Sequence, residues 1–177
     1  MILLALESFD SDFMEDHCLD ALERLGDEEA IDTMLERVGK RDQRAVEILG
    51  TTGVGSEAVV EAVRQHADAG DEHLRRAALI TLGQIGATAA IQDVADQLLA
   101  DDPAIRSVAA RALGLLGDTR TIAPLSELLA DDPDDTVRGS AAWALNQIGT
   151  EEAIGALEGY TTDSNYLVQA EAERARS

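Results

Sequence analysis

Apolar residues recur along this chain at a spacing that places them on one face of an α-helix. In the segment 74–85 the stripe consists of Leu74, Ala78, Thr81, Leu82 and Ile85, at the helical spacing i, i+4, i+7, i+8 and i+11, and all but Thr81 are apolar. The same spacing begins again at Ile105 and at Val137. Each stripe is followed by a second apolar run, and these runs begin at Ile91, Ile122 and Ile154. The pattern predicts pairs of amphipathic helices that recur along the chain.

A short motif ends each stripe. Leu82-Gly83-Gln84-Ile85-Gly86 returns as Leu113-Gly114-Leu115-Leu116-Gly117 and as Leu145-Asn146-Gln147-Ile148-Gly149, at offsets of 31 and 32 residues. The last glycine is expected to end the helix, because glycine tolerates the left-handed cap. The hexapeptide Leu-Leu-Ala-Asp-Asp-Pro occurs at 98–103 and 128–133, and its aspartate and proline are typical of the start of the next helix. Such self-similarity indicates a repeat array.

These residues resemble the HEAT repeat family, in particular the HEAT-like repeats of the phycobilisome-lyase type. That family's pattern is a helix reading roughly Val-Arg-x-x-Ala-Ala-x-Ala-Leu-Gly-x-Leu-Gly, then a short turn and a second helix that starts Ala-Ile. The resemblance implies an all-α fold, a right-handed α-solenoid of about five HEAT-like helix pairs plus terminal half-repeats. Tetratricopeptide arrays share the helix pairs but need aromatic anchors, and this chain has only one Trp, two Tyr and two Phe.

We expect one domain over residues 1–177. The predicted repeats are 11–40, 41–69, 70–101, 102–131 and 132–161, with an N-terminal half-repeat at 1–10 and a C-terminal capping helix in 162–177. Repeat 41–69 is irregular, because Thr52 replaces the expected aliphatic residue and Val54-Gly55-Ser56 lengthens the turn. We therefore expect a change of curvature or local softness there. The apolar start at 2–6 caps the array poorly, so that end is a candidate surface for self-association.

The chain is strongly acidic, with 35 acidic and 14 basic residues and a net charge of −21. Two interpretations stay open: a solvated surface adapted to concentrated salt, and a surface that holds a basic protein partner. Both argue against nucleic acid as a partner, since binding its backbone needs a basic face. No stretch approaches the length of a membrane span, and the opening segment has no basic residues before its short apolar run. These features favour a cytoplasmic protein without a membrane partner.

No stretch carries a recognisable catalytic motif, so we expect neither enzyme activity nor a cofactor. Cys18 falls on the apolar stripe of its repeat and is better explained as a small core residue than as a metal ligand. The three histidines also lack the tight pairs of a zinc site. Deoxyhypusine hydroxylases, which are HEAT-like enzymes, hold two irons with His-Glu dipeptides, and no His-Glu occurs in this sequence.

The predicted function is non-catalytic protein–protein interaction on the concave face, which the second helices line in HEAT arrays. Positions beside the apolar anchors of these helices are expected to face that groove: Asp32, Glu36, Glu61, Gln65, Asp93, Asp96, Glu127 and Glu158. Seven of these eight residues are carboxylates. Arg75, Arg106 and Arg138 recur in the first helices, four residues after an aspartate, and we interpret them as inter-repeat scaffold. The groove is therefore predicted to be acidic.

A second candidate interface involves Trp143 and Ile80, which occupy a slot that is usually polar in the family pattern. Tryptophan is enriched at interface hot spots, so this face is a further candidate for self-association. The alternative for Trp143 is that it folds over the apolar seam of its own repeat.

The alternative function is a lyase-like or chaperone-like subunit that acts on a tetrapyrrole-carrying protein, which follows from the family resemblance only. A bound chromophore would need a pocket rich in aromatic residues and a few basic residues, and neither is evident in the sequence.

If the acidity is an adaptation to salt, removing counterions should destabilise the fold through repulsion between like charges. We therefore expect the melting temperature to rise steeply between low and molar salt. A flat dependence, measured by circular dichroism, would remove this interpretation and favour the basic partner.

Overall fold

The computed structural model describes residues 28–52 and 55–176, and within them the chain forms ten α-helices and no strand. The α-helices are α3 (Glu28–Gly39), α4 (Gln43–Thr52), α5 (Glu57–Arg64), α6 (Glu72–Gln84), α7 (Ile91–Asp96), α8 (Pro103–Leu116), α9 (Ile122–Asp131), α10 (Asp135–Ile148), α11 (Glu151–Leu157) and α12 (Tyr166–Ala175). Short 3₁₀-helices are η1 (Thr88–Ala90), η2 (Gln97–Leu99), η3 (Thr119–Thr121) and η4 (Glu158–Tyr160). The half-repeat predicted at 1–10 and the first helix of repeat 11–40, which includes Cys18, lie outside the described residues.

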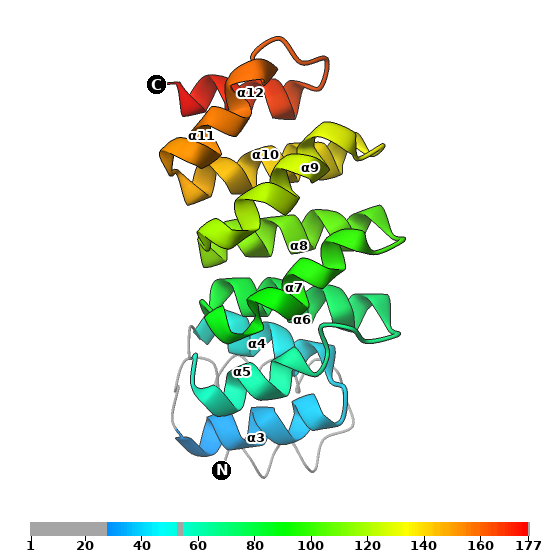
Figure 1. Ribbon diagram of the computed structural model, residues 1–177. Helices are drawn as coiled ribbons and strands as arrows, with labels where there is room; N and C mark the ends of the chain where they lie inside the picture. Colours follow the sequence, from blue (N-terminus) through cyan, green and yellow to red (C-terminus); the bar gives the residue numbers. More distant parts are fainter. Residues whose placement is uncertain (1–27, 53–54, 177) are drawn as a thin grey trace.

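The helices form two layers, and the chain alternates between them (Figure 1). The first-helix layer consists of α4, α6, α8, α10 and α12, each of which packs against the next. The second-helix layer consists of α3, α5, α7, α9 and α11. The predicted all-α solenoid is confirmed.

A continuous apolar core runs between the two layers. The stripe predicted in 74–85 is buried as far as Leu82, and Ile85 is half-buried. Burying each leucine of this kind contributes about 1.5 to 3 kcal/mol to stability. The one polar member of the stripe, Thr81, donates its hydroxyl hydrogen to the carbonyl of Val46 on α4 at 2.9 Å, so burial leaves this hydroxyl satisfied.

Two pairs of successive first helices, α6 with α8 and α8 with α10, approach each other closely at a glycine. A Cβ added to Gly83 would stand 2.9 Å from the Cα of Ala112 on α8, and one added to Gly114 would stand 2.7 Å from the Cα of Ala144 on α10. Such distances to backbone atoms are too short for any side chain. Asn146 stands in the corresponding place of the third copy, and its side-chain amide instead donates to Glu171 on α12 at 2.9 Å.

The helix ends follow the sequence motif. Gly86, Gly117 and Gly149 adopt positive φ angles of 67°, 68° and 66°, as expected for glycines that end helices. Asp102 caps α8 by accepting a hydrogen bond from the N–H of Ala104 at 2.8 Å, with Pro103 at the first helical position. This start was predicted.

The second hexapeptide does not start its helix in the same way, so that prediction was wrong. Two additional residues, Asp134 and Asp135, follow Pro133, and Asp134 caps α10. Asp132 lies instead at the end of α9, where it is buried and accepts a hydrogen bond from the N–H of Asp134 at 2.8 Å. The insertion moves the cap and releases the Asp132 carboxylate for another role.

The irregular repeat 41–69 is described only in part, because residues 53–54 of its turn lie outside the described residues. Ser56 caps α5 and accepts a hydrogen bond from the N–H of Val59. The change of curvature expected at this repeat stays a prediction.

We expect Gly114→Ala to lower the free energy of unfolding by about 1 to 3 kcal/mol, because the new methyl group would force α8 and α10 apart. Gly155→Ala is the matched control. Gly155 lies in the helix α11, and a methyl group added there would have no neighbouring atom within 4 Å, so alanine should stabilise the helix by up to about 1 kcal/mol. Urea unfolding followed by circular dichroism measures both, and equal effects of the two substitutions would contradict the close-packing explanation.

Candidate functional site

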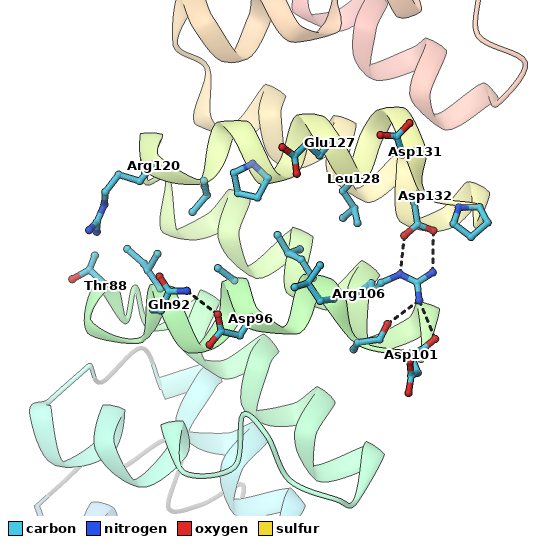
Figure 2. A pocket seen from close by; sticks show the side chains of 18 of the residues that line it. Thr88, Gln92, Asp96, Asp101, Arg106, Arg120, Glu127, Leu128, Asp131 and Asp132 are labelled. Atoms are coloured by element: carbon cyan, nitrogen blue, oxygen red, sulfur yellow. Dashed lines mark hydrogen bonds and ion pairs between the residues drawn. The ribbon is translucent and has the colours of Figure 1, made fainter.

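A large hollow lies in the second-helix layer, between α7 with η2 and α9 (Figure 2). We call it the α7–α9 cavity; its volume is about 1000 Å³. Its apolar lining comes from both walls: Ile91, Ala95, Leu98 and Leu99 on one side, Pro124 and Leu128 on the other. This volume is at the upper end of the range of about 300 to 1000 Å³ that is usual for ligand pockets.

Carboxylates border the same cavity. Asp96 and Glu127 lie on opposite walls, and Asp101 and Asp131 lie towards the end that holds Arg106 (Figure 2). All four residues are exposed, and none forms an ion pair in the part of the chain that the structure describes. Asp96 accepts one hydrogen bond, from the side-chain amide of Gln92 at 2.7 Å.

Arg106 closes one end of the cavity and is held by four hydrogen bonds. It donates to the two carboxylate oxygens of Asp132 at 2.7 and 3.0 Å, and to the carbonyls of Ala100 and Asp101 at 2.9 Å each. The side chains of Arg106 and Asp132 are only 13% and 4% exposed, so this is a largely buried, bidentate pair.

The pair shifts the ionisation of both partners. Burial raises the pKa of Asp132, but the hydrogen bonds from Arg106 and from the N–H of Asp134 outweigh burial, so the pKa lies below its usual value. The hydrogen bond to Asp132 raises the pKa of Arg106. Both groups are therefore charged at neutral pH and neither is free to hold a ligand.

At the other end of the cavity, Arg120 donates to the carboxylate of its neighbour Asp118 at 2.7 Å. This hydrogen bond, helped by the backbone N–H of Arg120, lowers the pKa of Asp118 to about 2. Both arginines of the cavity are thus engaged by aspartates, and its four other carboxylates are left without a counter-charge.

Comparison with known proteins identifies the fold. A family model for HEAT repeats matches residues 40–104 and 94–176, which is well over half of the chain. The chain belongs to the HEAT repeat family. The match is to HEAT repeats in general, and it gives no support to the phycobilisome-lyase type in particular. Comparison with curated proteins finds no match.

Several solved structures are similar in fold to this HEAT-repeat chain. An engineered protein has a TM-score of 0.65 at 20% identity, covering 98% of this chain and 93% of that chain. A designed armadillo repeat protein in complex with the peptide (KR)4 has a TM-score of 0.64 at 19% identity, covering 99% and 96%. Human deoxyhypusine hydroxylase in complex with glycerol has a TM-score of 0.51 at 17% identity, covering 99% and 83%. At such identities the likeness shows the fold alone.

The arginines of the HEAT ladder do not bind the side chains of the aspartates four residues before them, although Arg138 forms an ion pair with Asp135. Asp71, Asp102 and Asp134 cap their helices through backbone N–H groups. Arg106 reaches forward to Asp132 at the start of the next repeat, and Arg138 donates to the carbonyl of Asp132 at 2.9 Å. The Nε of Arg75 is buried without a hydrogen-bond partner. The inter-repeat role is therefore clear for Arg106, and its partner is a residue that the sequence analysis had placed at a helix cap.

The predicted groove residues share the second-helix side of the array but not one site. Asp96 and Glu127 line the α7–α9 cavity. Asp93 instead forms an ion pair with Arg64 at 2.5 Å between α7 and α5, and Glu61 lies 3.7 Å from the same guanidinium. Glu36 pairs with Lys40 at 2.8 Å, and this hydrogen bond lowers the pKa of Glu36. Three further exposed residues lie in or beside α3, α5 and η4: Asp32, Gln65 and Glu158.

Arginines are also present on the second-helix side, beside the predicted acidic residues. The guanidinium of Arg106 reaches the cavity from α8, Arg120 lines it from η3, and Arg64 lies on α5 in the second-helix layer. Four further cavity residues were not predicted from the sequence: Leu99, Asp101, Leu128 and Asp131. Both copies of the repeated hexapeptide contribute residues to the cavity. The exact repetition of this hexapeptide was therefore the feature of the sequence that could have indicated them.

Trp143 and Ile80 lie away from the cavity, on first helices. Trp143 is half-buried against α8, where the guanidinium of Arg111 lies 4.4 Å from its ring centroid. Its ring therefore packs on the preceding repeat, and the cation–π contact with Arg111 covers one face of the ring. Ile80 is exposed and lines a smaller cavity of about 280 Å³ between α4 and α6. Their role in self-association stays a prediction.

Among the described residues, no cluster of three or more His, Cys, Asp and Glu side chains could hold a metal ion. No helix in this part of the chain is long and apolar enough to cross a membrane.

We expect Asp132→Asn to lower the free energy of unfolding by about 1 to 3 kcal/mol at neutral pH, because it leaves the buried guanidinium of Arg106 without its counter-charge. The pKa of Asp132 is lower in the folded state than in the unfolded chain. Its ionised form therefore stabilises the fold above about pH 4 and loses that contribution as pH falls.

The difference in free energy of unfolding between wild type and Asp132→Asn should accordingly be largest at pH 7 and become smaller below about pH 4. Asp131→Asn is the matched control, because Asp131 is the next residue in the chain and its carboxylate is exposed and unpaired. This substitution should change the free energy of unfolding by less than about 0.5 kcal/mol. Denaturant unfolding across this pH range measures both variants. A difference for Asp132→Asn that does not depend on pH would contradict this account.

Proposed function

We propose that this HEAT-repeat protein is a non-catalytic scaffold that binds a basic segment of a partner protein on its second-helix layer. The observation that carries the proposal is the α7–α9 cavity, bordered by four exposed carboxylates without an ion pair among the described residues. A positively charged segment would supply the missing counter-charges, and complementary charge favours both rapid encounter and correct register.

The architecture supports this function, because stacked first helices hold the second helices in place without a partner. A preformed face avoids part of the ordering cost of binding. The designed armadillo repeat protein of similar fold is in complex with (KR)4, an alternating basic peptide. That likeness supports a basic protein segment as the class of partner for this chain. The predicted residues Asp32, Glu36, Glu61, Gln65, Asp93 and Glu158 would extend the binding face beyond the cavity.

The competing explanation for the charge is a surface adapted to concentrated salt. That explanation requires only that acidic residues be exposed over the whole surface. It therefore predicts the same effect of charge reversal in either helix layer. Binding that depends on the layer in which a charge is reversed would therefore separate the two explanations.

The tetrapyrrole alternative is not favoured by the cavity. Its lining contains no aromatic residue, and its two arginines already bind Asp132 and Asp118. The cavity therefore offers a chromophore no aromatic ring for stacking, and its arginines are already paired with aspartates.

Charge reversal in each layer tests the proposal, with fluorescently labelled (KR)4 as the probe. Asp96→Arg with Glu127→Arg should weaken binding at least about tenfold, or about 1.4 kcal/mol, because the carboxylates nearest the cavity become repulsive. Glu47→Arg with Glu173→Arg, on α4 and α12, changes the net charge equally and should change affinity less than about twofold. Fluorescence anisotropy measures the affinity of both double variants for the peptide. An equal loss of affinity in both would show that the peptide is attracted only by the overall charge.

A further inference from the structure

The α7–α9 cavity combines its acidic border with apolar walls that a purely basic segment would leave uncovered. Leu128 is half-buried and Leu99 is 88% exposed. Leu99 is therefore a large apolar side chain exposed to water at the edge of the α7–α9 cavity. An exposed apolar group at the edge of a concave site is typical of a contact that a ligand completes.

The exposure of Leu99 follows from the local backbone. In α9 the second leucine of the hexapeptide, Leu129, points into the core and is 1% exposed. In the other copy the chain tightens into the 3₁₀-helix η2, and Leu98 is buried in its place. A 3₁₀-helix has 3.0 residues per turn against 3.6 in an α-helix. This difference rotates the side chains, so the same hexapeptide turns Leu99 outward.

The charged groups stand at positions that would flank an apolar side chain bound in the cavity. Asp96 and Glu127 face each other across it, and Asp101 and Asp131 lie farther along towards Arg106 (Figure 2). Basic side chains on either side of a bound apolar residue could therefore reach carboxylates on both walls. Lysine and arginine suit such sites, because their stems can cover apolar surface while their charged ends stay in water.

Other occupants fit this cavity less well. An anion would meet four unpaired carboxylates, while both arginines are already engaged. A metal ion lacks a cluster of ligands in the described part of the chain. A second copy of this chain would bring another net charge of −21, which opposes association at this acidic face.

We infer that the α7–α9 cavity binds a short segment in which bulky aliphatic side chains are flanked by lysine or arginine. The aliphatic side chains contact Leu99 and Leu128, and the flanking cations reach Asp96, Glu127, Asp101 and Asp131. This inference rests on the proposed function, since it names the chemistry of the segment that the scaffold takes.

Two peptides of equal charge test it. Lys-Arg-Lys-Leu-Leu-Lys-Arg-Lys and Lys-Arg-Lys-Ser-Ser-Lys-Arg-Lys differ only in the central pair. Isothermal titration calorimetry with the full chain should show binding of the leucine peptide about tenfold tighter than of the serine peptide, which corresponds to about 1.4 kcal/mol. The heat-capacity change should also be more negative, because apolar surface is buried.

Leu99→Ser tests the site itself, because so exposed a side chain can be replaced with little effect on folding. This substitution should reduce the preference for the leucine peptide to less than about threefold. Leu115→Ser is the matched control: Leu115 is an exposed leucine of α8 in the first-helix layer, and its replacement should leave the preference unchanged. Circular dichroism checks that both variants are folded.

Each other outcome overturns the inference in a distinguishable way. Suppose that the two peptides bind equally well and that the Asp96→Arg, Glu127→Arg variant still loses binding. This result would contradict the aliphatic contact but would remain consistent with the proposed function. Failure of both peptides and of (KR)4 removes the proposed function as well. If Leu99→Ser and Leu115→Ser affect the preference for the leucine peptide equally, this preference does not arise from the contact with Leu99. A dimer that only Leu99→Ser dissociates, measured by analytical ultracentrifugation, would make a second copy the occupant.

Discussion

The structure depends on the close contact between successive first helices. A glycine allows this contact between three successive pairs of first helices: Gly50 faces Thr81, Gly83 faces Ala112, and Gly114 faces Ala144. Because the backbones nearly touch there, the distance between repeats is fixed by the chain itself, with little freedom for side chains to adjust it. The same contacts set the positions of α7 and α9, and thereby the width of the cavity between them.

Charge is organised around this apolar scaffold in two different ways. Where an acid is buried between repeats, as Asp132 is, it is bound bidentately by Arg106 and serves the structure. The other acids that border the α7–α9 cavity, Asp96, Asp101, Glu127 and Asp131, have no such partner among the described residues. The free carboxylates thus stand on a preformed surface, which is the arrangement that lets a repeat array recruit a basic segment.

The sequence predicts those features that depend on local patterning. The stripe in 74–85, the left-handed glycines and the cap at Asp102 follow from periodicity and backbone preference. The cavity was harder to predict, because it depends on small differences between copies. Two inserted residues convert Asp132 from a cap into the partner of Arg106, and one 3₁₀ turn exposes Leu99. Asp96 and Glu127 were found because their positions follow the helical period, whereas Asp101 and Asp131 lie at or beyond helix ends, where periodicity gives no direction.

The central claim is that the second-helix layer, held in place by the packed first helices, is the binding surface. Amide chemical shifts of the ¹⁵N-labelled chain, recorded while the peptide with the central leucine pair is added, test it most directly. The account predicts that the changes concentrate in α7, η2 and α9, with small changes in α6, α8 and α10 because the scaffold is preformed. Changes centred on Ile80 or Trp143 in the first-helix layer, or spread evenly over both layers, would contradict it.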